Sequence, residues 1–135
     1  MIFVDTNILI DIVDNDPIWA DWSQQQLQSA AFVGDVAIND VVYAELAIGY
    51  QSPDDLESMI GRLGIAVLPT PRIALFIAGK AHQRYRLAGG VRTGVLPDFF
   101  LSAQALAAGA ELITRDVRRY RTYFPDLALI APTPD

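Results

Sequence analysis

The sequence contains no cysteine and only one histidine, His82. A chain without thiols forms no disulfide, no thiolate metal site and no cysteine nucleophile, and this composition fits a cytoplasmic protein. The usual nitrogen and sulfur ligands of a zinc site are missing as well. His82 stands beside Lys80 and Arg84 in a predicted helix, where we expect it to be solvated rather than catalytic. Any metal site in this chain would therefore be built from oxygen ligands.

Long apolar runs are also absent. The longest uncharged apolar stretch, residues 99–110, is bracketed by Asp98 and Glu111 and is too short to cross a bilayer. The N-terminus lacks the basic region of a signal peptide, so we expect no association with a membrane. With 135 residues, 52% of them hydrophobic, and a mean hydropathy of +0.26, the chain is predicted to form one globular domain, residues 1–135.

Basic residues are absent from the first part of the chain. All 10 lysines and arginines lie at Arg62 or later, whereas 11 of the 16 acidic residues precede it. Either the protein has a basic face for a polyanion and an acidic face elsewhere, or the fold interleaves the two parts and their fields cancel. The net charge of −6 and the pI near 4.5 argue against tight, non-specific binding to nucleic acid.

Strand-like and helix-like segments alternate along the chain. Short apolar strands are predicted at residues 2–4, 36–38, 65–68, 112–114 and 127–130, with helices between them that begin near residues 8, 17, 40, 53, 71 and 97. This alternation predicts an α/β fold, a three-layer α/β/α sandwich with a short, mostly parallel central sheet. Residues 89–94 are predicted to form a mobile loop and residues 132–135 a loose tail. The loop is not a P-loop, because it follows a helix and lacks the Gly-Lys-Ser/Thr ending.

Four carboxylates stand where such a fold would bring them to one edge of the sheet. These are Asp5, Glu45, Asp98 and Asp116. Asp5 and Asp116 each follow a predicted strand, and ligands of parallel sheets bind beyond the carboxyl ends of the strands. Four such charges stay ionised together only if cations offset their repulsion. Oxygen ligands select Mg²⁺ or Mn²⁺, and such ions promote hydrolysis at phosphorus by activating a water molecule.

Each of these acids also has a structural explanation. Asp5 could serve only as the N-cap of the next helix, and Asp98 only as a first-turn acid that complements the helix dipole. Glu45 lies in residues 40–49, a helix that is apolar nearly all round and is therefore predicted to be buried. A buried glutamate needs a partner, so Glu45 is either a metal-site residue, part of a salt bridge with an arginine, or a surface residue.

Arginine and tyrosine alternate directly after the last of the four acids. Arg115, Arg118 and Arg119 would hold the phosphates of a nucleic acid, with Tyr120 or Tyr123 available for base stacking. Arg92, in the predicted loop, is a further candidate for RNA binding. The alternative is a surface helix that shields its own carboxylates.

Together these motifs resemble the PIN-domain family and, more narrowly, the VapC toxins of bacterial toxin–antitoxin pairs. The resemblance spans essentially the whole length and rests on short motifs in a fixed order. They are Asp5-Thr6-Asn7, Glu45 in an apolar helix, Pro97-Asp98-Phe99-Phe100, and Leu112-Ile113-Thr114-Arg115-Asp116 followed by residues 118–125.

The resemblance implies a Mg²⁺-dependent endoribonuclease, with Mn²⁺ as an expected substitute. The acidic quartet of the family maps onto the catalytic candidates Asp5, Glu45, Asp98 and Asp116, of which Asp5, Asp98 and Asp116 would hold the metal. The supporting polar positions of the family map onto Thr6, Asn7 and Thr114. The resemblance also implies a homodimer, an RNA substrate, and a cognate VapB-type antitoxin that covers the acidic pocket, often with an inserted arginine.

Two other functions compete with this interpretation. A non-catalytic interaction module on the same fold would use the acids only to bind a basic partner. An aspartate-based phosphotransferase is disfavoured, because Asn7 replaces the second aspartate of haloacid-type enzymes and Lys80, the only lysine, lies in the middle of a helix.

Overall fold

A sheet of five short parallel strands forms the centre of the structure, a computed structural model that describes residues 1–92 and 95–133. The strands are β1 (Ile2–Val4), β2 (Val36–Asn39), β3 (Ala66–Leu68), β4 (Glu111–Ile113) and β5 (Leu129–Ile130). They are arranged in the order β3-β2-β1-β4-β5, and every neighbouring pair is parallel. The predicted parallel sheet is thus confirmed. The predicted loop and tail include residues 93–94 and 134–135, which lie outside the described residues.

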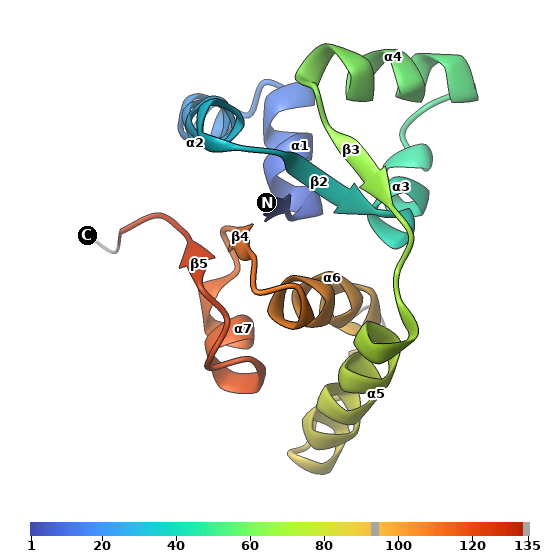
Figure 1. The fold of residues 1–135 in the computed structure, drawn as a ribbon, viewed down its shortest axis with the longest axis vertical. Helices are drawn as coiled ribbons and strands as arrows, with labels where there is room; N and C mark the ends of the chain where they lie inside the picture. Colours follow the sequence, from blue (N-terminus) through green and yellow to red (C-terminus); the bar gives the residue numbers. More distant parts are fainter. Residues whose placement is uncertain (93–94, 134–135) are drawn as a thin grey trace.

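Helices cover the sheet on both sides. They are α1 (Thr6–Val13), α2 (Ala20–Val33), α3 (Asp40–Ala47), α4 (Pro53–Leu63), α5 (Arg72–Leu87), α6 (Val95–Ala107) and α7 (Val117–Tyr123). In Figure 1, α1, α2 and α4 lie on one side of the sheet and α5, α6 and α7 on the other. This division follows from right-handed crossovers, because the chain moves one way from β1 to β3 and the other way from β4 to β5. The predicted three-layer arrangement is confirmed.

The core lies on both faces of the two central strands. Phe3, Val4, Leu112 and Ile113 are at most 1% exposed. Strands of a parallel sheet are buried on both faces and therefore read as continuous apolar runs, which is why short stretches such as Ile2–Val4 could be recognised as strands. Each large side chain buried in this way contributes about 1.5–3 kcal/mol. The core fixes the strand ends from which the candidate site projects.

Local capping chemistry sets several helix ends. The Asn39 side chain accepts the amide of Val42 at 2.9 Å and begins α3, and Gly64 ends α4 with a φ of 68°, where a side chain would be strained. The predicted start of the second helix at residue 17 was wrong. The Asp16 side chain accepts the amides of Ile18 and Trp19, both at 2.9 Å, and this turn delays α2 until Ala20.

The apolar helix α3 is only partly buried, and the prediction that it is buried all round was wrong. Val42 and Leu46 are buried, whereas Ala47 and Ile48, at the end of the helix, are exposed, Ile48 by 89%. The helix α3 contacts α1, α4 and α6, but Ala44, Ala47 and Ile48 remain exposed. An apolar sequence therefore does not establish that its own chain buries it.

An aromatic cluster joins α5, α6 and α7 beneath the carboxyl edge of the sheet. Phe99 makes ring contacts with His82, Tyr85, Tyr123 and Phe124 at centroid distances of 5.3–6.5 Å. His82 was expected to be solvated, but it is partly buried and packs against these rings. The cluster fixes the start of α6 relative to α7, and both helices contribute charged residues to the candidate site.

Within the described ranges, no helix is long and apolar enough to cross a lipid bilayer.

Candidate active site

The candidate site lies where the strand order reverses. The chain leaves β1 toward β2 and leaves β4 toward β5, on opposite sides, although β1 and β4 are neighbours with Val4 beside Ile113. The connections therefore diverge and open a crevice beyond the carboxyl ends of these two strands, where open α/β sheets bind their ligands. Asp5 follows β1 directly, and Thr114 follows β4.

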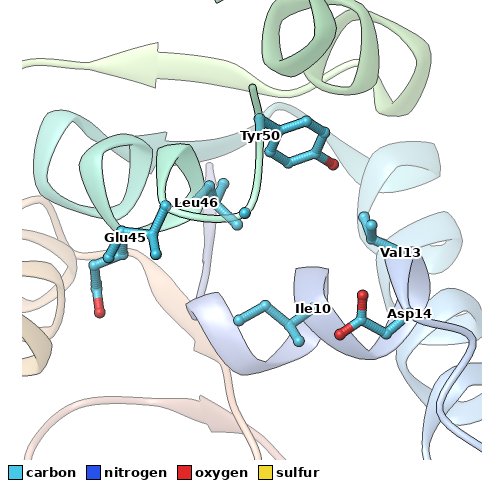
Figure 2. Close-up of a pocket in the computed structure, with 8 residues that line it drawn as sticks. Ile10, Val13, Asp14, Glu45, Leu46 and Tyr50 are labelled. Atoms are coloured by element: carbon cyan, nitrogen blue, oxygen red, sulfur yellow. The ribbon is translucent and has the colours of Figure 1, made fainter. Parts of the chain in front are cut away.

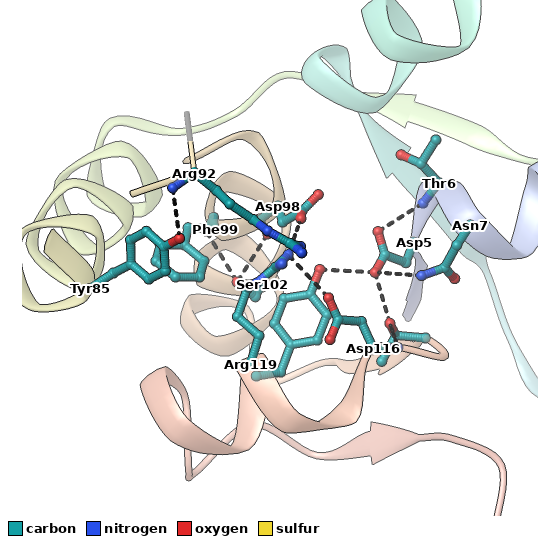
Figure 3. A network of polar contacts seen from close by, with 12 residues as sticks. Asp5, Thr6, Asn7, Tyr85, Arg92, Asp98, Phe99, Ser102, Asp116 and Arg119 are labelled. Atoms are coloured by element: carbon teal, nitrogen blue, oxygen red, sulfur yellow. Dashed lines mark hydrogen bonds and ion pairs between the residues drawn. The ribbon is translucent and has the colours of Figure 1, made fainter. Parts of the chain in front are cut away.

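Asp5 is the most buried carboxylate of the site. It is only 4% exposed and accepts hydrogen bonds from the Thr6 amide at 2.9 Å, the Thr114 hydroxyl at 2.8 Å and the Tyr120 hydroxyl at 2.9 Å. A longer contact of 3.4 Å comes from the Asn7 amide group. Figure 3 shows Thr6 and Asn7 beside this carboxylate, with dashed lines for the hydrogen bonds that it accepts. Asp5 does cap α1, but the cap uses only part of its hydrogen-bonding capacity.

Asp98 and Asp116 share one cation, the guanidinium of Arg119. Its Nη1 atom lies 2.5 Å from Oδ2 of Asp98 and 3.1 Å from Oδ2 of Asp116. Asp98 stands in the first turn of α6, and Arg119 lies on α7. The Asp116 amide donates to the Thr114 hydroxyl at 3.0 Å, so Thr114 links Asp116 to Asp5. The two aspartates and Arg119 are drawn together in Figure 3.

Glu45 joins the site from α3. It is half-buried, and its Oε1 atom accepts a hydrogen bond from the Thr6 hydroxyl at 3.2 Å. Among the described residues no arginine or lysine forms an ion pair with it, so the salt-bridge explanation of this glutamate is not supported. Thr6 therefore connects Glu45 to Asp5, whose carboxylate accepts the Thr6 amide.

The pKa values show that the four acids act on one another. The pKa of Asp98 is raised to about 7, mainly by burial and also by the charges of Asp5, Glu45 and Asp116, while Arg119 opposes the rise. Burial also raises the pKa of Asp5, against the hydrogen bonds that favour its charged form, and burial raises the pKa of Glu45. Carboxyl groups with raised pKa values in a crevice are typical of functional sites.

These residues fit a divalent cation by chemistry and by charge. Their ligating atoms are carboxylate oxygens, which Mg²⁺ and Mn²⁺ prefer, and a cationic guanidinium already lies between two of them. In residues 1–92 and 95–133, however, no three acidic or imidazole side chains converge closely enough to form a ready-made metal site. Asp5, Asp98 and Asp116 would have to move closer together around an ion, and Asp98 and Asp116 retain some solvent exposure.

Arg115 has a partner that the sequence did not reveal. It donates to both carboxylate oxygens of Asp11, at 2.7 and 2.8 Å, and its guanidinium lies 5.0 Å from the ring centroid of Trp19. Asp11 is 3% exposed and also accepts the hydroxyl of Ser23 at 2.8 Å. The backbone amide of Arg115 donates to Asn7 at 3.4 Å. Arg115 therefore clamps the segment that carries Asp116 onto α1 and α2.

The remaining candidates for RNA contact differ in exposure. Arg92 and Arg118 are exposed, whereas the guanidinium groups of Arg115 and Arg119 form ion pairs with aspartates. A role of these four arginines in RNA binding stays a prediction. Tyr120 is fully buried, so its predicted use for base stacking was wrong. Sequence reasoning also missed the bond between Tyr120 and Asp5, because a tyrosine in an arginine-rich run carries no local signal of burial.

A groove with mostly apolar walls opens beside the site, between α1 and α3. Its volume is about 340 Å³, and its lining includes Ile10, Val13, Glu45, Leu46 and Tyr50. Figure 2 shows the α1 side chains facing Leu46 and Tyr50 across the groove. Because Glu45 belongs both to this lining and to the acidic set, an occupant of the groove would reach the candidate site.

The family model of the PIN domain matches residues 2–125. No protein in the curated collection matches the chain. Solved structures of toxin–antitoxin proteins share its fold. VapBC2 from Rickettsia felis, bound to a promoter DNA fragment, gives a TM-score of 0.73 at 21% identity over 97% of this chain and 98% of that one.

Two further structures give the same result. A toxin–antitoxin complex from Klebsiella pneumoniae has a TM-score of 0.72 at 21% identity over 100% of this chain and 100% of that one. VapBC-1 from nontypeable Haemophilus influenzae has a TM-score of 0.70 at 23% identity over 97% of this chain and 98% of that one. At these identities the similarity establishes a shared fold over the whole described sheet and its helices.

Proposed function

The chain belongs to the PIN domain family, and we propose that it is a Mg²⁺-dependent endoribonuclease, the VapC-type toxin of a toxin–antitoxin pair. The main support is the proximity of Asp5, Glu45 and Asp116 to Asp98, close enough that the charge of each raises the pKa of Asp98. The four acids come from four segments far apart in sequence.

Each acid has a distinct proposed role. Asp5 and Asp98 are the direct ligands of the ion, and Asp116 joins them directly or through water. Glu45 either binds a second ion or orients the attacking water. A bound divalent ion supplies a water molecule of lowered pKa and stabilises charge on the leaving oxygen. Mn²⁺ is expected to substitute for Mg²⁺, because both ions prefer oxygen ligands.

The polar neighbours hold these carboxylates in position. Thr6 and Thr114 each bridge two acidic positions, through bonds of 2.8–3.2 Å, and Asn7 contacts both Asp5 and the Arg115 amide. Donors that hydrogen-bond to the ligands of a metal fix the direction of the ligating oxygens. Arg92 and Arg118, both exposed, would bind phosphates of the RNA and set its register rather than its sequence.

The cleavage test compares the wild type with Asp98→Asn. A pool of fluorescent single-stranded RNA oligonucleotides of random sequence is incubated with Mg²⁺ or EDTA, and cleavage is followed by gel electrophoresis. We expect EDTA to abolish cleavage and Asp98→Asn to lower its rate at least about a hundredfold, because the substitution removes a charged ligand. Asp126→Asn is the matched control, since Asp126 is exposed on the loop after α7 and loses the same charge. Wild-type rates from a folded Asp98→Asn protein would refute the nuclease.

The alternative is a non-catalytic PIN-fold module whose acidic pocket binds a basic partner. The observation that favours it is the guanidinium of Arg119 between Asp98 and Asp116, which shows that the pocket accommodates an arginine. Anomalous scattering from crystals soaked in Mn²⁺ separates the two functions. Density between Asp5 and Asp98, lost in Asp98→Asn, supports the nuclease; its absence both with and without a bound RNA oligonucleotide supports the module.

The groove between α1 and α3 is the proposed seat of a VapB-type antitoxin. Its apolar lining and the exposed Ile48, at 89%, offer burial to an apolar partner segment, and exposed patches of this kind mark interaction sites. A basic side chain of the same partner would reach Glu45 and the other acids. The test is cleavage by the purified toxin with and without the co-expressed antitoxin.

A homodimer is proposed as well. Ile73 and Phe76 are exposed by 57% and 64% on α5, the helix that projects from the body of the molecule in Figure 1. Light scattering of the purified chain measures its mass directly, and a monomer at micromolar concentration would contradict this proposal. We place the protein in the cytoplasm, where its RNA substrate is made.

A further inference from the structure

We propose that Arg119 is a built-in counterion that competes with the divalent ion for Asp98 and Asp116 and must leave them before the ion can bridge them. The inference rests on the proposed function, because it concerns the same site. It assigns Arg119 a task different from that of the neighbouring arginines, and it predicts that removing this cation improves metal binding.

The position of the guanidinium carries the argument. Nη1 of Arg119 lies 2.5 Å from Oδ2 of Asp98 and 3.1 Å from Oδ2 of Asp116. The side chain is only 18% exposed, and Figure 3 shows it pointing inward between the two aspartates. It is therefore an internal part of the site and not a surface arginine that happens to pass nearby.

An ion that bridges the same two oxygens cannot coexist with this contact. Mg²⁺ binds its oxygen ligands at about 2.0–2.1 Å, so it would have to occupy the space in which Nη1 now lies. The positive guanidinium would also repel the ion at this distance. An ion held by these two Oδ2 atoms would therefore compete with the contact that Arg119 makes to them.

The charges of the site favour the exchange. Within the described residues, Arg119 is the only base that forms an ion pair with any of the four acids. The hydrogen-bond donors to Asp5 are all neutral, and they are Thr6, Asn7, Thr114 and Tyr120. One guanidinium leaves most of the negative charge unbalanced, and a divalent ion offsets more of it. We therefore expect the ion to displace Arg119. The ion pairs that Arg119 loses in this exchange reduce the affinity of the site for the ion.

The fold allows the arginine to move without loss of the helix. Tyr120, the next residue, is fully buried and bonded to Asp5, and Tyr123 packs against Phe99. These two side chains hold α7 against the core. The Arg119 side chain has several rotatable bonds and keeps 18% exposure, so its guanidinium can turn toward solvent while the backbone stays in place.

The test is isothermal titration of the full-length, metal-free chain with MnCl₂ at 0.15 M salt and pH 8. We compare the wild type with Arg119→Gln, Arg119→Lys and the matched control Arg121→Gln. Arg121 lies on the same helix and is exposed, so its loss changes the net charge equally. We expect Arg119→Gln to bind Mn²⁺ about tenfold more tightly, in keeping with the loss of a charge-assisted bond. Arg121→Gln should match the wild type, because salt screens a distant exposed charge.

Circular dichroism in EDTA establishes that each variant is folded. If Arg119→Gln does not fold, Arg119→Lys decides, because it keeps the charge but loses the planar geometry and should bind Mn²⁺ more tightly than the wild type. Weaker Mn²⁺ binding in the folded Arg119 variants would mean that Arg119 positions the ligands. Equal gains in Mn²⁺ affinity in Arg119→Gln and Arg121→Gln would mean a general charge effect. Either result overturns the inference. Absence of Mn²⁺ binding in all proteins overturns it too, and RNA cleavage by Asp98→Asn then tests the nuclease separately.

Discussion

The hydroxyl of Tyr120 offers the sharpest test of how the site is built. It is fully buried and donates to Oδ2 of Asp5 at 2.9 Å, and the two residues are 115 positions apart in sequence. Replacing Tyr120 by phenylalanine removes this donor and leaves the ring, so the packing of α7 is kept. The substitution therefore isolates one hydrogen bond to a buried carboxylate.

The expected cost is about 2 kcal/mol of unfolding free energy at pH 8. A hydrogen bond to a charged group contributes about 1.5–3 kcal/mol, and Asp5 keeps two other short bonds, from Thr114 and Thr6, which places the loss near the lower half of that range. Burial already raises the pKa of Asp5 above its ordinary value, and the Tyr120 bond counteracts this rise. The variant raises the pKa of Asp5 further. The deficit is therefore full above the folded-state pKa of Asp5 and shrinks as the pH falls through it.

Urea denaturation in EDTA, at pH 8 and pH 5, measures this deficit. Tyr123→Phe is the matched control, because Tyr123 lies on the same helix and its hydroxyl has no hydrogen-bond partner among the described residues; it should cost less than about 0.5 kcal/mol. Two results would refute the reasoning about Asp5. One is that Tyr120→Phe is as stable as Tyr123→Phe at pH 8, and the other is that the loss of unfolding free energy grows toward pH 5.

Two further predictions concern charge. Because the pKa of Asp98 is about 7, protons compete with the metal near and below that pH, and the Mn²⁺ affinity measured by calorimetry should fall about fivefold from pH 7 to pH 6. An affinity independent of pH would contradict a role for Asp98 as a ligand. Arg115→Gln leaves Asp11 buried without its cation and should cost about 3 kcal/mol in urea denaturation, whereas Arg118→Gln, on the exposed side, should be neutral within about 0.5 kcal/mol.

Much of the fold follows from patterns that are local in the sequence. Central strands of a parallel sheet are buried on both faces, so they leave apolar runs such as Ile2–Val4 that alternate with helices. The cap at Asn39 and the left-handed Gly64 also depend on neighbouring residues only. The burial of α3 did not follow, because an apolar face looks the same whether its own chain or another molecule is meant to cover it.

The candidate site was predictable as a set of acids but not as a network. Asp5 and Asp116 could be assigned to one edge because parallel strands share the direction of their ends. Their partners are not written in the local sequence, since Arg115 bonds to Asp11 across 104 positions and Tyr120 to Asp5 across 115. Such pairs form only when distant segments of the chain pack together, which no short motif specifies.

The helical period of α7 explains why its arginines are not equivalent. Side chains three or four positions apart share a face of a helix, so Asp116, Arg119 and Tyr120 turn toward the crevice, and Arg118 and Arg121 turn to solvent. A phosphate approaching from outside therefore meets the outward pair first. Arg119 becomes available to it only after leaving the carboxylates. If metal entry releases Arg119, the event that fills the site with a cation also adds a positive charge to the surface on which we propose that RNA binds.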